Sequence, residues 1–135
     1  MKYVLLLLAA LGIAVSALAL REHYRTEGDS PCSINERWDC GIVNHSPYAT
    51  LHGIPVAVIG IAGYLLLGAL AFGKKYSWML PFVTIATVFA IHLADIEAFV
   101  LGVWCIYCAA SLGVITLMTV LVIGKVIADS TPRAR

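Results

Sequence analysis

Residues 105–128 read CIYCAASLGVITLMTVLVIGKVIA, an apolar run that a single charged side chain, Lys125, interrupts. A helix needs about 20 apolar residues to cross the hydrocarbon core of a bilayer. Three comparable runs lie at about residues 3–20, 51–72 and 78–101. Because these runs are continuously apolar rather than alternating, they predict helices and not the strands of a membrane barrel. The sequence therefore predicts an all-α transmembrane four-helix bundle.

The composition supports a membrane protein with a single domain, residues 1–135. Hydrophobic residues make up 61% of the chain and charged residues 13%, whereas soluble domains carry about 25% charged residues. A soluble chain of this length could not bury so much apolar surface. The formal net charge is +1, so the protein lacks the basic field that binding of nucleic acid needs. The expected surroundings are the lipid bilayer.

The first apolar run has two interpretations. Lys2 precedes it, and Ala17-Leu18-Ala19 resembles the A-x-A cleavage site of a signal peptide. The run is longer than the apolar core of a usual signal peptide, which has about 7–15 residues. We therefore expect a retained helix and keep the cleaved signal peptide as the alternative.

Basic residues predict the orientation of the bundle. The larger group falls on one side of the predicted helices: Lys2, Lys74, Lys75, Lys125, Arg133 and Arg135. The smaller group falls on the opposite side, among acidic residues: Arg21, Arg25 and Arg37. Because the cytoplasmic loops of membrane proteins are enriched in Lys and Arg, we expect both termini in the cytoplasm. The long loop between the first two helices, residues 21–50, then faces outward.

All four cysteines fall on the outward side in this orientation. Cys32 and Cys40 lie in the long loop, and Cys105 and Cys108 form a CxxC motif that opens the fourth helix. Disulfides persist on that side of a membrane, and a helix N-terminus stabilises a thiolate. We expect Cys105 to be exposed to partners and Cys108 to point deeper into the bundle. Such an arrangement suits thiol–disulfide exchange, which needs direct contact between the reacting sulfurs.

Other interpretations of the polar residues stay open from the sequence alone. Both cysteine pairs could be inert disulfides of a structural tetraspan protein. A zinc site with His45 or His52 is less favoured, and we expect no metal, because the two paired C-x-x-C motifs of a usual zinc site are missing. A third alternative is a small transporter that uses ionisable residues of the third helix, which are costly in a membrane and usually functional. These residues are His92, Asp95 and Glu97.

The residues of the third helix cannot all serve one site. Asp95 and Glu97 are about 200° apart around a helix, so they face different sides. His92 and Asp95 are three residues apart and can meet.

The order of these motifs resembles the vitamin K epoxide reductase family, in its prokaryotic branch that forms disulfides. The matching features are the loop pair Cys32 and Cys40, Ser46 six residues further on, the run SPYATLHGIP at residues 46–55, and the CxxC motif. The resemblance covers essentially the whole chain. It implies a bundle in a prokaryotic cell membrane that holds a quinone near its outward end, of the ubiquinone, menaquinone or vitamin K type.

The resemblance also implies a role for each site residue. A thioredoxin-like protein on the extracytoplasmic side passes electrons to the quinone along the path Cys32, Cys40, Cys105 and Cys108. Cys108 lies beside the quinone and Ser46 near its head group. Glu97 matches an acidic position of the bacterial relatives and is expected at the quinone or at the site of proton transfer.

The sequence departs from parts of the family in two places. Animal members that reduce vitamin K epoxide carry a tyrosine where Leu112 stands, so we do not expect the epoxide as a substrate. Many bacterial relatives carry a fused thioredoxin-like domain. This sequence stops at Arg135, so we expect the thioredoxin-like partner to be a separate protein.

Overall fold

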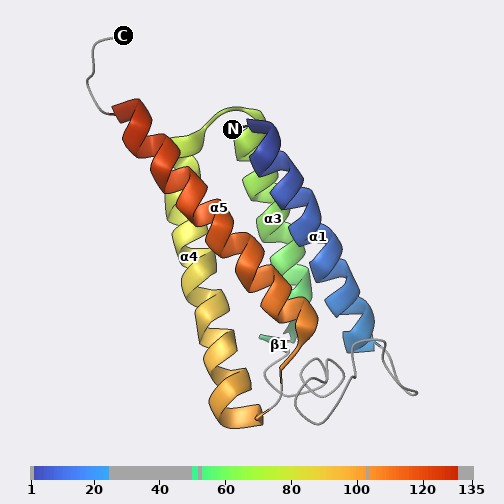
Figure 1. Ribbon diagram of the computed structural model, residues 1–135. Coiled ribbons are helices and arrows are strands. Elements are labelled where there is room, and N and C mark those ends of the chain that lie inside the picture. Colours follow the sequence, from blue (N-terminus) through green and yellow to red (C-terminus); the bar gives the residue numbers. More distant parts are fainter. Residues whose placement is uncertain (1, 25–49, 52, 103, 131–135) are drawn as a thin grey trace.

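The helices of the protein lie side by side as a bundle in its computed structural model (Figure 1). The structure describes residues 2–24, 50–51, 53–102 and 104–130. In chain order the elements are α1 (Lys2–Tyr24), β1 (Thr50–Leu51), β2 (Ile54–Pro55), α3 (Val56–Phe72), α4 (Tyr76–Asp95), the π-helix η2 (Ile96–Leu101) and α5 (Ile106–Ser130). The π-helix continues α4 directly. The predicted helical membrane bundle is confirmed.

Three of these helices are long and apolar enough to cross a membrane, among the residues that the structure describes. The three spans are Lys2–Arg21, Tyr76–Val100 and Ile106–Asp129. The apolar helix α3 has 17 residues, which gives a length of about 25 Å, at the short end of the membrane-spanning range. Large apolar side chains such as Leu65 and Ile85 are exposed on the outside of the bundle. Lipid tails solvate such side chains, so this surface fits a membrane protein.

The core forms where α1 packs against α3 and α5, and where α4 packs against α5. Fully buried side chains come from each of these helices: Leu5, Leu67, Met79, Val83, Met118 and Val122. Small residues let the helices approach closely. A Cβ atom at Gly12 of α1 would overlap the ring of Tyr64, and one at Gly68 of α3 would lie 3.4 Å from Ala9. The helix α1 therefore supplies part of the core.

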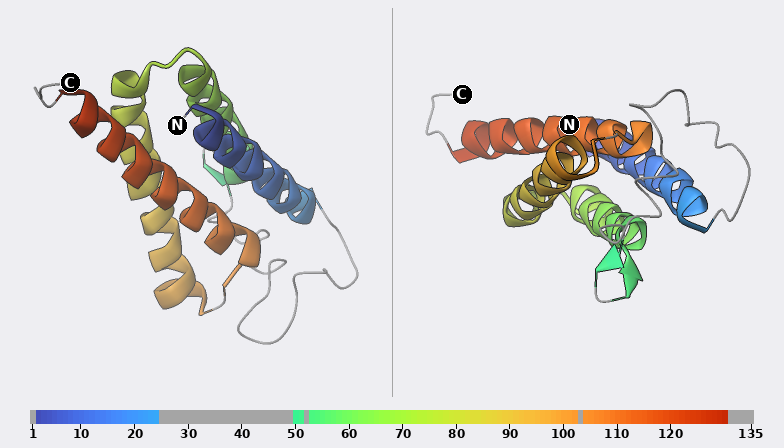
Figure 2. Two further views of the ribbon diagram at one scale, coloured as in Figure 1. Left: turned by 45° about the horizontal axis from the view of Figure 1, so that its top comes forward. Right: turned by 90° about the horizontal axis from the view of Figure 1, so that it is seen from below.

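The second helix begins at Val56, so the predicted start at residue 51 is wrong. Strands β1 and β2 precede the helix as an antiparallel hairpin, in which Gly53 turns the chain with φ of 83°. A proline disfavours helical backbone in the residue before it and has no N–H for the helix ladder. Pro55 therefore keeps Ile54 extended and becomes the N-cap of α3. The hairpin projects from the start of α3 on the side away from α5 (Figure 2).

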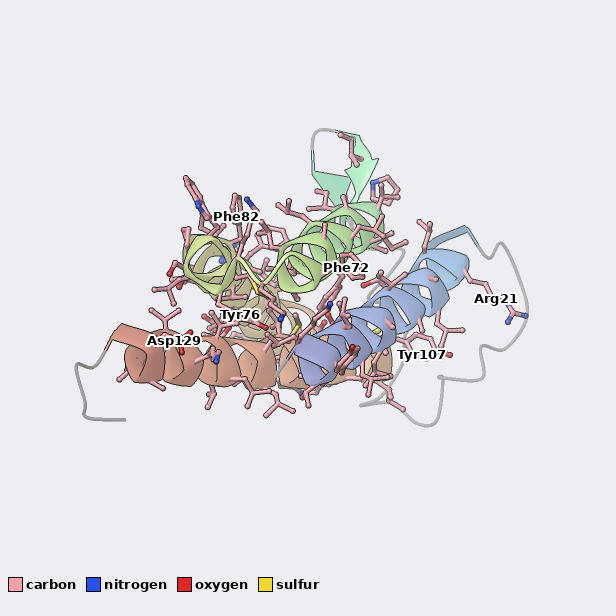
Figure 3. The ribbon with its side chains drawn as sticks, turned by 90° about the horizontal axis from the view of Figure 1, so that it is seen from above. Arg21, Phe72, Tyr76, Phe82, Tyr107 and Asp129 are labelled. Atoms are coloured by element: carbon pink, nitrogen blue, oxygen red, sulfur yellow. The ribbon has the colours of Figure 1, made fainter. Side chains whose placement is uncertain are left out.

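The start of α1, the turn between α3 and α4, and the end of α5 lie at one end of the bundle (Figure 1). Lysines at this end contact aromatic rings: Nζ of Lys2 is 4.5 Å from the ring centre of Phe72, and Nζ of Lys125 is 5.6 Å from that of Tyr76. Figure 3 shows Tyr76 on the side of α4 that faces α5. Lys74 lies in the turn, with φ of 59°. Basic residues therefore gather at this end, and the hairpin and the start of α5 lie at the other.

Candidate functional site

The CxxC motif lies where the chain enters α5. Cys105 is the residue before the helix, and Cys108 is in its first turn. The backbone N–H of Cys108 donates a hydrogen bond to Sγ of Cys105, with 3.4 Å between nitrogen and sulfur. No disulfide joins these two sulfurs to each other in the part of the chain that the structure describes. Both sulfurs are thus at the amino end of a helix, and the backbone N–H of Cys108 points at the sulfur of Cys105.

The exposure of the two cysteines differs from the prediction. Cys105 is 0% exposed, so the expectation that it faces partners is wrong. Cys108 is partly exposed and lines an internal cavity, which agrees with its expected position towards the bundle. The chain folds back between η2 and α5, and this places a side chain of η2 against the backbone of Cys105. The sequence around the CxxC motif gives no sign of that contact.

Glu97 reaches the CxxC motif from the π-helix η2. Its Oε2 accepts a hydrogen bond from the backbone N–H of Cys105 at 3.5 Å, and its carboxyl group contacts the thiol of Cys108. Glu97 is 3% exposed. Gly102 follows η2 with φ of 70°, a conformation that glycine adopts without strain, and it turns the chain back towards α5. π-Helical turns are rare and often occur at functional sites.

His92 and Asp95 lie outside this site. Both are exposed on α4, and neither lines the cavity beside Cys108. Among the residues that the structure describes, no ion pair joins these two side chains. Glu97 is buried only two residues beyond Asp95. The prediction that Asp95 and Glu97 face different sides is therefore confirmed.

A cavity of about 460 Å³ lies beside Cys108. Residues of α1, α3, α4, η2 and α5 form its wall, and most of them are apolar. The polar and amphipathic side chains in the wall are Ser16, Tyr64, Glu97, Trp104, Tyr107, Cys108 and Ser111. Sites for small molecules usually have volumes of about 300–1,000 Å³ and an apolar wall with a few polar groups. The cavity has the size and the lining of a site for an apolar ring compound.

The cavity reaches the outer surface of the bundle between α3 and α4. Leu66, Phe82 and Ile85 line the cavity, yet they are 41%, 39% and 66% exposed. Figure 3 shows Phe82 on the side of α4 that faces away from α5. Along this side α3 and α4 pack less closely than the other neighbouring helices. A ligand in the cavity can therefore extend into the lipid phase.

Sequence reasoning missed polar residues of the wall, among them Tyr64 and Ser111. The hydroxyl oxygen of Tyr64 lies 2.9 Å from Oγ of Ser111 and 3.0 Å from its carbonyl oxygen. Ser111 follows Cys108 by three residues, so helical spacing could have identified it. Tyr64 stands in an apolar run of α3, where nothing in the sequence distinguishes it from a core residue.

Of the predicted site residues, the structure brings together Glu97, Cys105 and Cys108. The other candidates lie outside the part of the chain that the structure describes: Cys32, Cys40, Ser46, His45 and His52. Their roles stay predictions.

Comparison with known families gives one match. Residues 3–123 match the model of the vitamin K epoxide reductase family. No curated protein matches the chain. The matched range begins in α1 and ends within α5, so it includes the cavity and both cysteines of the CxxC motif.

Proposed function

Since the chain belongs to the vitamin K epoxide reductase family, we propose that it oxidises the thiols of a thioredoxin-like protein and passes the electrons to a membrane quinone. Family and apolar helices together make it a membrane oxidoreductase. The proposal adds the two substrates. One observation carries it: Cys108 stands in the wall of an apolar cavity, in contact with Cys105 and Glu97.

The residues of the cavity fit a quinone. A quinone has a flat ring with two oxygens and, in membranes, an apolar tail. The apolar wall and the volume of the cavity suit the ring, and the opening between α3 and α4 suits the tail. Cys108 and Glu97 line the end of the cavity where we expect the ring to react. We place Ser46 near the same end of the cavity. A quinone bound there supplies an acceptor for two electrons and two protons.

Electrons follow the order of the cysteines. The dithiol of the partner reduces a Cys32–Cys40 disulfide through a mixed disulfide. Cys40 then attacks Cys105 in a Cys105–Cys108 disulfide, and Cys108 leaves as a thiolate at the cavity wall. Cys32 attacks Cys40, which restores the loop disulfide and releases Cys105. When Cys105 and Cys108 form their disulfide again, two electrons and two protons pass to the quinone, so each cycle makes one disulfide in the partner and one quinol.

Glu97 holds the proton that Cys108 exchanges. Its carboxyl group contacts the Cys108 thiol and is buried away from bulk water. The hydrogen bond from the backbone of Cys105 orients the carboxyl group. Positioned acids and bases typically accelerate a reaction by about 10²–10⁴-fold. Glu97 is therefore the proposed acid and base at the reacting sulfur.

We place the CxxC motif on the extracytoplasmic side of a prokaryotic cell membrane, with both termini in the cytoplasm. Lys2, Lys74 and Lys75 belong to the end of the bundle opposite the start of α5. An excess of Lys and Arg is typical of the cytoplasmic side. Disulfide chemistry belongs on the other side of such a membrane. The thioredoxin-like partner then works in the same compartment as the cysteines.

The cavity does not favour vitamin K epoxide as a substrate. Leu112 lines it, at the position where epoxide-reducing animal members carry a tyrosine. A leucine side chain has no O–H group to donate to an epoxide oxygen. We therefore propose a quinone of the ubiquinone, menaquinone or vitamin K type as the acceptor, and not the epoxide.

The proposal is tested by an anaerobic assay of the purified protein in detergent. Quinone absorbance is followed after addition of a small dithiol, with ubiquinone and with menaquinone. The wild type is expected to consume quinone, and Cys108→Ala is expected to consume none. Gly113→Ala is the matched control on the same helix, because a Cβ atom there meets nothing within 4 Å, and it should keep the wild-type rate.

Two results contradict the proposal. The first is a natively folded wild type that consumes neither quinone; this favours a structural tetraspan protein with inert disulfides. The second is a Cys108→Ala variant that reduces quinone as fast as the wild type, which removes Cys108 from the reaction.

A further inference from the structure

We propose that Tyr64 and Ser111 form a hydrogen-bonding anchor for the quinone oxygen that lies away from Cys108. The inference rests on the proposed quinone reduction and adds the residues that hold the far end of the ring. Tyr64 comes from α3 and Ser111 from α5, and both line the cavity. Their hydroxyl groups are a polar spot in a wall that is otherwise mostly apolar.

The two hydroxyl groups have fixed positions. The Tyr64 hydroxyl oxygen lies 2.9 Å from Oγ of Ser111 and 3.0 Å from the carbonyl oxygen of the same residue. Tyr64 is 5% exposed, and its ring passes Gly12 of α1 so closely that a Cβ atom there would overlap it. The ring is thus confined between α1 and α5. Its hydroxyl group is positioned before a ligand arrives, so little side-chain freedom is lost on binding.

The pair lies at a suitable distance from the reacting sulfur. Ser111 follows Cys108 by three residues, so both side chains are on the same side of α5. Their α-carbons differ by about 4.5 Å along the helix axis. Glu97 approaches Cys108 from the other direction, at the start of α5. A ring that touches the Cys108 sulfur and follows α5 therefore directs one oxygen towards Glu97 and the other towards the hydroxyl pair.

A count of hydrogens shows why the pair suits both redox forms of the ligand. The two hydroxyl groups carry two hydrogens. The Tyr64 O–H donates to the carbonyl oxygen of Ser111 and thereby links the two residues. The Ser111 O–H can then be donated to a quinone carbonyl, which only accepts. A quinol O–H group donates, and the hydroxyl oxygens have lone pairs that accept it. The anchor can thus avoid leaving a buried polar oxygen unpaired, which is costly in an apolar site.

A second hydroxyl pair provides the matched contrast. Thr87 of α4 and Thr119 of α5 lie 2.7 Å apart, but neither residue lines the cavity. The Thr119 hydroxyl also lies 2.8 Å from the carbonyl oxygen of Ile115. This pair links two helices in the same way as Tyr64 and Ser111, without access to a ligand. Its removal reports the effect of a lost helix contact alone.

The experiment uses the full chain in detergent, with a short-chain ubiquinone and a small dithiol. The variants are Tyr64→Phe, Ser111→Ala, their combination, and Thr87→Val as control. The Michaelis constant for the quinone is expected to rise by about 3- to 10-fold in each single variant, the range of one hydrogen bond. Binding to the variants in a Cys108→Ala background, measured by tryptophan fluorescence, should weaken by the same factor. In the combined variant, the rise in the Michaelis constant should be smaller than the product of the two single rises, because the hydroxyl groups act as a unit.

The possible results separate this inference from the proposed function. A wild type that turns over, with Tyr64→Phe and Ser111→Ala at the wild-type Michaelis constant and affinity, overturns the anchor and leaves quinone reduction in place. An equal rise of the Michaelis constant in Thr87→Val also overturns the anchor, because weaker helix packing then explains the effect. A wild type that reduces and binds no quinone overturns both. A Michaelis constant that rises in Tyr64→Phe and Ser111→Ala but not in Thr87→Val supports the anchor.

Discussion

Replacing Glu97 with glutamine should separate the proton transfer at Cys108 from the structural role of the carboxyl group. The amide oxygen of glutamine can still accept the hydrogen bond from the backbone of Cys105. That bond is long, at 3.5 Å, so even its loss would cost no more than about 1 kcal/mol of stability. The amide cannot exchange a proton with the Cys108 thiol. A loss of acid–base catalysis by about 100-fold corresponds to about 2.7 kcal/mol in the barrier, which clearly exceeds the structural effect.

The assay follows quinone reduction by protein whose cysteines have been reduced beforehand. Under single-turnover conditions, Glu97→Gln is expected to slow the step by about 100-fold or more. Its thermal unfolding in detergent should stay within a few degrees of the wild type, as expected for a change of about 1 kcal/mol. The matched control is Asp95→Asn, which makes the same chemical change two residues away. Asp95 is exposed and does not line the cavity, so this variant should react at the wild-type rate.

Three outcomes would refute this reasoning. Single-turnover reduction by Glu97→Gln within about twofold of the wild type would show that the carboxyl group exchanges no rate-determining proton. An equal loss in Asp95→Asn would show that any negative charge near the end of α4 has the same effect. Unfolding of Glu97→Gln at a much lower temperature would mean that the carboxyl group is mainly a structural contact.

Three further predictions concern other parts of the chain. Cys32→Ala should abolish quinone reduction driven by the thioredoxin-like partner and keep the reduction driven by a small dithiol; retained turnover with the partner would remove Cys32 from the path. Gly12→Ala should lower the free energy of unfolding by about 1–3 kcal/mol, because its Cβ overlaps the ring of Tyr64. Gly113→Ala should not lower it in the same denaturation experiment, because its Cβ meets nothing within 4 Å and alanine favours the helix. Thr87→Val should destabilise the bundle by only about 0.6 kcal/mol, the usual value of a hydrogen bond between membrane helices, and a loss above about 2 kcal/mol would contradict that estimate.

The number of helices was predictable because hydropathy over a long window reports the lipid environment directly. The ends of the helices were less accessible. Hydropathy placed residues 51–55 in the second span, although Pro55 and Gly53 shape a hairpin there. The first helix extends to Tyr24, beyond the apolar run. Hydropathy marks the part of a helix that lies in lipid, and it does not mark where the helical hydrogen bonds end. The π-helix Ile96–Leu101 changes the hydrogen-bond pattern without changing hydropathy, so nothing in the composition marks it.

The site was predictable where its parts lie close together in sequence. Helical spacing predicts that Cys105 and Cys108 lie close together and that Asp95 and Glu97 face different sides. Contacts between distant segments were not accessible in this way. The hydrogen bond between Tyr64 and Ser111 joins residues 47 positions apart, and it depends on how α3 and α5 pack.

The burial of Cys105 gives the proposed electron path a source of selectivity. A thiolate must reach a disulfide sulfur directly to exchange with it, and Cys105 is 0% exposed. Attack therefore needs a local opening, which disfavours a bulky protein dithiol from solution more than a small dithiol. Cys40 is ten residues before Thr50 in the same chain, so its effective concentration at the site is set by the tether and does not depend on dilution. An attacking group held in this way meets each opening far more often than a free thiol does. The buried sulfur then exchanges with the loop pair while Cys108 faces the cavity, and the thiol chemistry on the aqueous side stays separate from the quinone chemistry on the lipid side.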